Sequence, residues 1–135
     1  MAYPTVSAPY GFKPVNRVDG MPYAGQTRQL TIASGYAANI FYGDLVELVT
    51  GGTIQKFTGT TSGAMVGVFV GCQYTDPSTK QPRNAQYWPT GTVASDAVAY
   101  VVDDPMAQFQ VAVTNSSSEV VDTTTIAARG ANMSV

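Results

Sequence analysis

The sequence contains no histidine and a single cysteine, Cys72. Histidine is the usual general base near neutral pH and the commonest metal ligand, so its absence removes both roles. One cysteine alone forms neither an intramolecular disulfide nor a thiolate zinc site. A free cysteine usually behaves as a small buried apolar side chain, and we expect Cys72 to lie inside a strand. These absences predict a protein that is not an enzyme and that uses no cofactor or metal ion.

Charged residues are scarce as well. They make up 12% of the 135 residues, with seven basic against nine acidic side chains. The basic residues are spread from Lys13 to Arg129, which leaves no positive patch for a phosphate backbone, so nucleic acid binding is not expected. No apolar run approaches a membrane span, and the N-terminus lacks the basic start and apolar core of a signal peptide. We therefore expect a protein that is made in the cytoplasm, has no membrane contact and exposes a neutral, hydroxyl-rich surface.

The length fits one domain with a single hydrophobic core. Residues 1–27 contain four prolines and three glycines among Tyr, Phe, Val and Met, a spacing that predicts an extended N-terminal arm. The arm carries more apolar surface than a solvated linker, so it packs either along its own domain or on a partner, and simple disorder is the remaining alternative. Residues 28–113 are the expected β-rich core domain. Residues 114–135 form a polar C-terminal segment, which is either a last strand or an incomplete end.

Within the core, short apolar stretches alternate with turn-forming residues. Gly51 and Gly52 indicate a hairpin, because glycine tolerates the positive φ values of tight turns. The nearly continuous apolar run at 65–70 indicates a strand covered on both faces, and Gly63, Gly67 and Gly71 mark a bulge or a close backbone approach there. The predicted strands are residues 28–32, 40–42, 45–50, 53–57, 65–70, 86–88, 97–102 and 108–113. This pattern predicts an all-β fold, a single compact β-sandwich or β-barrel-like domain.

Asp103 and Asp104 are the best candidates for a carboxylate site, and Asp76 and Asp96 lie in neighbouring loops. Convergent carboxylates suit a calcium ion. Asp-Asp-Pro after an apolar strand is also a good turn, because Asp side chains accept backbone hydrogen bonds and Pro105 fixes φ. A small hydrolase is the third alternative, and it would have to work without a histidine or cysteine partner. We favour the turn.

Tyr74, Tyr87 and Trp88 flank the loop DPSTKQPRN, which carries Lys80 and Arg83. Aromatic and Arg side chains on a loop are typical of a protein-binding hot spot. The three rings also suit stacking on a sugar, which would make the chain a carbohydrate-binding or adhesive β domain on a virion or cell surface. The remaining alternative places Tyr87 and Trp88 in the core.

Six phrases of the sequence resemble the capsid decoration, or cement, proteins of tailed bacteriophages. They are PYGFKPVN (9–16), PYAG (22–25), SGYAANIFYGDLVELV (34–49), VGVFVGCQYTD (66–76), YWPTGT (87–92) and AYVVDDPMAQFQV (99–111). The resemblance rests on the order and number of these phrases. It implies a β-rich virion protein on the outer surface of the head, where it binds and bridges major capsid protein subunits and stabilises the capsid, often as a trimer.

The arm supplies most of the expected contacts with the capsid. Proline lowers the entropy that an arm loses on docking, and aromatic side chains provide contact area. The candidate contact residues are Tyr3, Tyr10, Phe12, Tyr23, Lys80, Arg83 and Trp88. The predicted partners are the major capsid protein and further copies of this chain.

Overall fold

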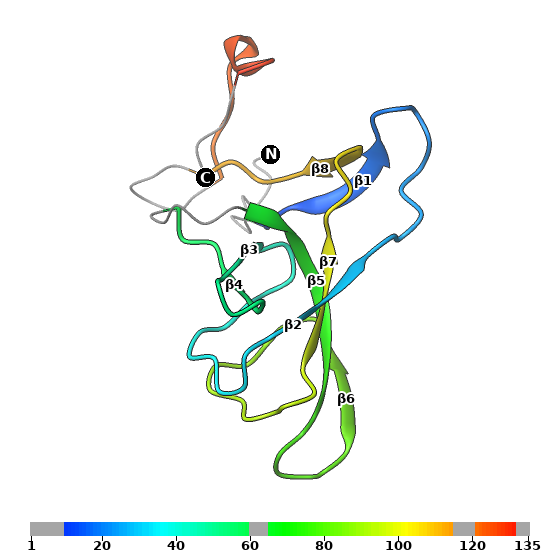
Figure 1. The fold of residues 1–135 in the computed structure, drawn as a ribbon. Coiled ribbons are helices and arrows are strands. Elements are labelled where there is room, and N and C mark those ends of the chain that lie inside the picture. Colours follow the sequence, from blue (N-terminus) through cyan, green and yellow to red (C-terminus); the bar gives the residue numbers. More distant parts are fainter. Residues whose placement is uncertain (1–9, 60–64, 115–120, 132–135) are drawn as a thin grey trace, which may run out of the picture.

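This computed structural model describes residues 10–59, 65–114 and 121–131 (Figure 1). These residues contain eight β-strands and one short 3-10 helix. No α-helix occurs in these residues, and none of their helical segments has the length and hydropathy to cross a membrane. The all-β prediction is confirmed. The elements are β1 (Lys13–Arg17), β2 (Arg28–Thr31), β3 (Leu45–Leu48), β4 (Ile54–Lys56), β5 (Met65–Thr75), β6 (Pro82–Ala85), β7 (Val98–Val102), β8 (Ala107–Gln110) and the 3-10 helix Ile126–Ala128.

β5 is the centre of a six-stranded sheet. β7 pairs antiparallel with one edge of β5, while β3 and β6 share the other edge, β3 along its first part and β6 along its last part. β2 continues the sheet beyond β7 and β4 continues it beyond β3, in the order β2-β7-β5-β3-β4. A parallel bridge between Ile32 and Ile54 joins the two ends of this order. The sheet therefore curls into a barrel-like shape.

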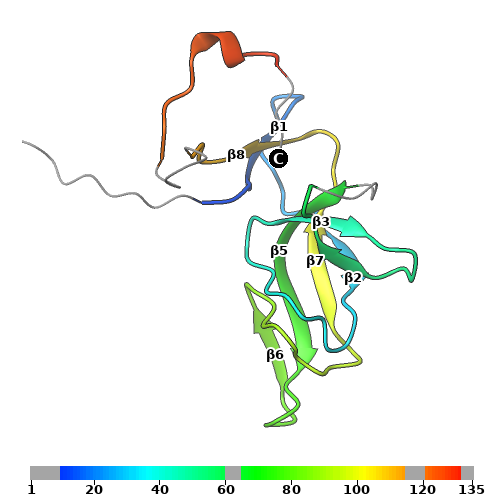
Figure 2. The same cartoon turned by 90° about the vertical axis from the view of Figure 1, so that its left-hand side faces the viewer.

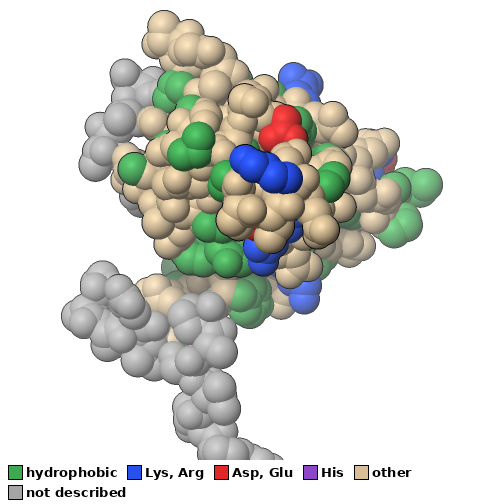
Figure 3. Space-filling model, turned by 90° about the horizontal axis from the view of Figure 1, so that it is seen from below, with side chains coloured by type: hydrophobic (Ala, Val, Ile, Leu, Met, Phe, Trp, Pro, Cys, Tyr) green, Lys and Arg blue, Asp and Glu red, His purple; other side chains and the backbone are tan. Residues whose placement is uncertain are grey.

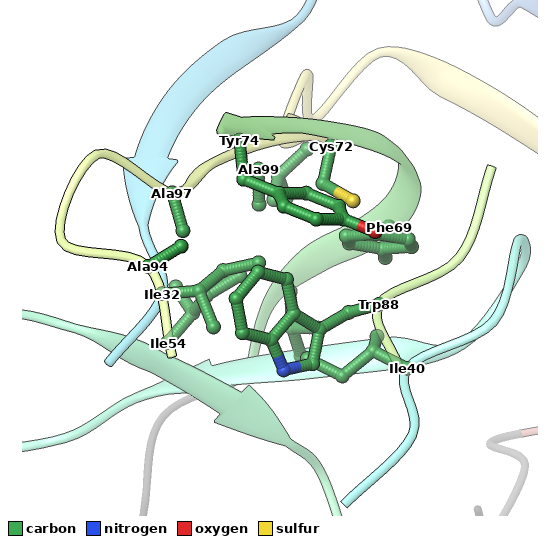
Figure 4. Close-up of a cluster of buried hydrophobic side chains, with 12 residues drawn as sticks. Ile32, Ile40, Ile54, Phe69, Cys72, Tyr74, Trp88, Ala94, Ala97 and Ala99 are labelled. Atoms are coloured by element: carbon green, nitrogen blue, oxygen red, sulfur yellow. The ribbon is translucent and has the colours of Figure 1, made fainter. Parts of the chain in front are cut away.

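The core lies inside this curled sheet (Figure 4). Trp88 is 0% exposed, and its ring lies edge-on to Tyr74 with centroids 5.3 Å apart. Cys72 is buried on β5 and its Sγ lies 3.3 Å from the Tyr87 carbonyl oxygen. Burial raises the pKa of the Cys72 thiol to about 11, so it is an unreactive apolar side chain at neutral pH. The other buried members are Ile32, Ile40, Val46, Ile54, Phe69, Ala94, Ala97, Ala99 and Val101.

The acidic side chain of Glu47 is buried, with 1% of its surface exposed. It faces Gln55 across the β3 and β4 pair, and Gln55 Nε2 donates a hydrogen bond to its Oε1. A buried carboxylate needs such partners to offset its lost hydration. The pair therefore ties β4 to β3 by a side-chain contact in addition to the backbone ladder.

The predicted glycine roles are confirmed where the structure describes the residues. The β3 to β4 hairpin turns at Gly51 and Gly52, and Gly52 has φ of 80°. Gly67 lies against β7 so closely that an added Cβ would overlap the Val102 carbonyl oxygen and approach Val101 Cγ1 to 2.9 Å. The register of β5 on β7 shifts between Phe69 and Gly71, which is the predicted bulge. Gly63 lies outside the described residues.

A second, two-stranded sheet of β1 and β8 stands at one end of the main sheet (Figure 2). Phe12 at its start packs edge-on against Phe109, with ring centroids 6.2 Å apart. This ribbon includes residues 13–17, which the sequence analysis placed in the arm, so that part of the arm packs on its own chain. Residues 1–9 lie outside the described residues.

Two expected strands were wrong and two observed strands were not predicted. Residues 40–42 and 86–88 form no named strand, and only a bridge between Ile40 and Trp88 joins them. β1 and β6 were missed because Pro14 lies inside one and Pro82 begins the other. Proline removes a ladder donor, but an edge strand can leave that position unpaired.

Candidate functional site

Four aromatic side chains stand at the surface beside the ribbon. They are Tyr10, Phe41, Tyr42 and Tyr87, which are 46%, 49%, 42% and 42% exposed. Phe41 and Tyr87 stack, with ring centroids 5.9 Å apart and planes inclined by 22°. Tyr10, Phe41 and Tyr42 line an open groove of about 540 Å³ together with Gly11, Lys13 and Asp44. We call this the aromatic groove.

A tight turn presents Phe41 and Tyr42. Asp44 Oδ2 accepts a hydrogen bond from the Phe41 N–H at 2.9 Å, and the Asp44 N–H donates to the Phe41 carbonyl. Gly43 adopts φ of 90°, a conformation that glycine tolerates best, and its N–H donates to the Phe69 carbonyl on β5. The turn is thus hydrogen-bonded internally and fixed to the central strand, which holds the two exposed rings on a rigid base.

The same turn holds the first described residues of the chain. The Phe12 N–H donates to the Gly43 carbonyl at 2.9 Å, and an added Cβ on Gly11 would lie 2.6 Å from that oxygen. The Tyr10 carbonyl accepts a hydrogen bond from Ala112 beyond β8. Two of the phrases that carry the family resemblance, residues 9–16 and 34–49, therefore meet at the contact between Gly11 and Gly43.

Opposite charges lie at the edge of the groove. Lys13 and Asp44 line it, and Lys56 Nζ lies 3.2 Å from Asp44 Oδ2. Because these side chains are partly exposed, such a pair adds little stability. The groove is an aromatic surface with a few polar groups at its margin, which is the usual composition of a binding site.

The predicted contact residues have different places in the structure. Tyr10 is in the aromatic groove, and Phe12 is half-buried against Phe109. Tyr23 is half-buried, and its hydroxyl donates to the Gln26 carbonyl at 2.6 Å. Tyr3 lies outside the described residues. Among the described members of this arm set, Tyr10 alone therefore joins the exposed aromatic cluster.

The prediction that Trp88 contacts a partner is wrong. Its side chain is fully buried beside Tyr74, so neither ring is available for a partner or a sugar. The core alternative holds for Trp88 but not for its neighbour Tyr87, which is exposed and stacks on Phe41. Alternation along an extended segment puts adjacent side chains on opposite faces, and this separates the two residues.

Lys80 lies in the turn between β5 and β6 and Arg83 lies on β6, and neither of them lines the aromatic groove. Both are exposed, and Lys80 has φ of 60°. Arg83 Nη1 lies 3.5 Å from Asp76 Oδ2. Figure 3 looks at the molecule from below and shows a few charged side chains among hydrophobic side chains and uncharged surface.

The acidic residues form turns and pairs. Arg28 Nε lies 2.7 Å from Asp103 Oδ2, and Asp104 Oδ1 accepts a hydrogen bond from the Met106 N–H at 2.9 Å. The predicted turn at Asp103 and Asp104 is confirmed. The Asp96 carboxylate instead accepts hydrogen bonds from the N–H and the hydroxyl of Thr75. Among the residues that the structure describes, no three Cys, Asp or Glu side chains are grouped so as to hold a metal ion.

Phe41 and Tyr42 are the groove residues that the sequence analysis missed. The sequence pattern predicts a strand over residues 40–42, and rings within a paired strand would be expected to pack inward. The usable signal was the following Gly-Asp pair, which favours a turn. Two aromatic residues in the first half of a turn are exposed more readily than two within a paired strand.

Comparisons with protein-family models, curated proteins and solved structures find no match for this chain. The resemblance to decoration proteins therefore stays a prediction.

Ser78→Ala is expected to raise the pKa of Asp76. The Ser78 hydroxyl and N–H both donate to Asp76 Oδ1, and the hydroxyl is the largest cause of the lowered pKa of this carboxyl. Because the folded pKa lies below the unfolded one, the carboxylate stabilises the fold above the unfolded pKa. That contribution is lost as pH falls through the folded pKa. NMR titration of the side-chain carboxyl measures the shift.

Asp96 is the internal control for this titration. Its pKa is lowered by the Thr75 hydroxyl and N–H, which the substitution leaves in place. The Asp96 titration should therefore be unchanged in the variant. An Asp76 titration that also stays unchanged would contradict the assigned cause.

Proposed function

We propose that this chain is a virion structural protein that decorates the outer surface of a tailed-phage head, where it binds and bridges major capsid protein subunits. The observation that carries the proposal is the aromatic groove, which exposes Phe41 and Tyr42 on a rigid turn beside Tyr10, the first residue of the described chain. In this proposal the protein is made in the host cytoplasm, stabilises the head and associates with further copies, as a trimer.

The chemistry of the groove supports a protein partner. Tyr and Phe bury a large area while losing few rotamers, and residues of this kind supply many interface hot spots. The turn that carries Phe41 and Tyr42 is hydrogen-bonded to β5, so little ordering cost remains on binding. The low charge of the chain limits the polar surface that an interface would have to dehydrate.

The arrangement of the family phrases supports the same function. Residues 9–16 and 34–49 are far apart in sequence, and they share the contact between Gly11 and Gly43. This contact is where the arm joins the barrel. A protein that bridges subunits through an arm needs a firm attachment at that point, because a loose base would raise the entropy cost of docking.

Binding to purified heads that lack the protein tests the proposal. The double variant Phe41→Ala with Tyr42→Ala should weaken head binding by about tenfold or more, because it truncates two exposed rings without touching the core. A variant lacking residues 1–9 should bind more weakly as well. Val93→Ala is the matched control, since Val93 is 67% exposed and lies outside the residues that line the groove. Full head occupancy by the groove variant would overturn the proposal.

A second candidate is a carbohydrate-binding or adhesive surface. The stacked and exposed Phe41 and Tyr87 favour this candidate, whereas the buried Tyr74 and Trp88 do not. The same purified variants distinguish the two functions. Binding to bacterial glycans that depends on Tyr42 and Phe41, without any binding to heads, would select the second candidate.

A further inference from the structure

We propose that the aromatic groove binds the proline-containing segment of residues 1–9 from a second copy of the chain, so that copies are joined through exchanged arms. The inference rests on the self-association in the proposed function and assigns the groove to a neighbouring copy, so that the groove variant weakens head binding by breaking the bridge between copies. It is tested on the isolated protein without heads. Failure of the exchange there, with head binding still dependent on Phe41 and Tyr42, would leave the proposed function standing.

The groove suits a proline-containing segment. Such segments form polyproline II helices and dock in grooves lined by aromatic rings, because the helix is already ordered before it binds. Tyr10, Phe41 and Tyr42 supply the ring faces, and each is at least 42% exposed. A polyproline II helix leaves its carbonyl oxygens free of internal hydrogen bonds. The Lys13 ammonium at the groove offers a donor for them.

Residues 1–9, MAYPTVSAP, have the matching chemistry. They contain Pro4 and Pro9 and no charged side chain, so the segment itself brings no side-chain charge into the groove. Tyr3 and Val6 add apolar area between the prolines. The net charge of −2 gives little repulsion between two copies.

The point where the segment joins the described chain argues for a second copy. The described chain starts at Tyr10, and Tyr10 itself lines the groove. Ala8 precedes Pro9, and the residue before a proline favours extended backbone. This preference favours a segment that runs away from Tyr10 over one that folds back across it. Nine residues in polyproline II geometry span about 28 Å, which is enough to reach a neighbouring molecule.

Two complementary variants of the full-length chain test the exchange. The groove variant carries Phe41→Ala and Tyr42→Ala, and the arm variant carries Tyr3→Ala and Pro4→Ala. Sedimentation velocity across a concentration series should show that each variant alone self-associates about tenfold or more weakly than the unmodified chain. An equimolar mixture should form a pair, because the intact arm of one variant meets the intact groove of the other. Val93→Ala should associate as the unmodified chain does.

Three results would overturn the proposal. They are an unmodified chain that stays monomeric at every concentration, a mixture that forms no pair, and variants that associate undiminished. The substituted groove side chains are exposed, so loss of association through unfolding is not expected, and circular dichroism checks it.

A spin label distinguishes binding to a second copy from binding within one molecule. Ala2→Cys introduces a thiol for labelling, while Cys72 is buried and stays unlabelled. Spin-labelled protein is mixed with isotope-labelled protein that has no spin label. Broadening of the amide signals of Phe41 to Asp44 in this mixture confirms exchange. Broadening only when both labels are on one molecule shows that the arm folds back on its own groove, and overturns the proposal.

Discussion

Gly67→Ala is expected to lower the free energy of unfolding by about 3 kcal/mol, the upper end of the usual cost of overpacking a core. A Cβ at this position would overlap the Val102 carbonyl oxygen and lie 2.9 Å from Val101 Cγ1. Neither group can move aside freely, because β7 is paired with β2 on its far side. The variant must therefore separate β5 from β7 near the middle of the main sheet, and urea denaturation followed by circular dichroism measures the loss.

Gly51→Ala is the matched control for Gly67. Gly51 lies in the β3 to β4 turn without a positive φ, and an added Cβ there has no neighbour within 4 Å. Its effect should stay within about 0.5 kcal/mol, as for most surface substitutions. If the two variants were equally stable, the close approach at Gly67 would not constrain the sheet.

Trp88→Ala is expected to cost about 3–5 kcal/mol, the usual range for truncating a fully buried large aromatic side chain. Trp88 is 0% exposed and supports Tyr74 edge-on. Its backbone also exchanges two hydrogen bonds with Ile40, the residue before the turn that carries Phe41. The cavity should therefore destabilise the barrel and loosen the aromatic groove together.

Tyr87→Ala tests whether the stability cost of truncating Trp88 comes from its burial and not from its place in the chain. Tyr87 precedes Trp88 directly but is 42% exposed, so its truncation should cost less than about 1 kcal/mol. Because the chain has a single tryptophan, unfolding is best followed by circular dichroism, which works for both variants. A larger loss for Tyr87→Ala than for Trp88→Ala would contradict the assignment of the core.

The sequence predicted most of the main sheet for identifiable reasons. The continuous apolar run of β5 and the two glycines between β3 and β4 are local signals, and both elements lie where they were expected. β6 and β1 depend on pairing partners elsewhere in the chain. Residues 82–85 contain exposed polar side chains, so nothing in their periodicity indicates a strand. Pairing with β5 determines their conformation.

The candidate site was predicted only in part. Tyr10 and the arm were expected to form a contact surface, because proline and aromatic residues together are a local pattern. The partners of Tyr10 were not predictable in this way. Phe41 and Tyr42 meet Tyr10 only because Gly11 packs against Gly43. Such a close approach of two backbone segments has no signature in the spacing of either.

The bridge between Ile32 and Ile54 affects how readily the main sheet can add strands from other molecules. An open sheet edge is a template on which another molecule can add its own strand, and closure of a sheet removes that template. β2 and β4 meet at this bridge, and β6 begins with Pro82 and carries Arg83, both of which oppose strand addition. Addition of strands from other molecules at these edges of the main sheet is therefore disfavoured.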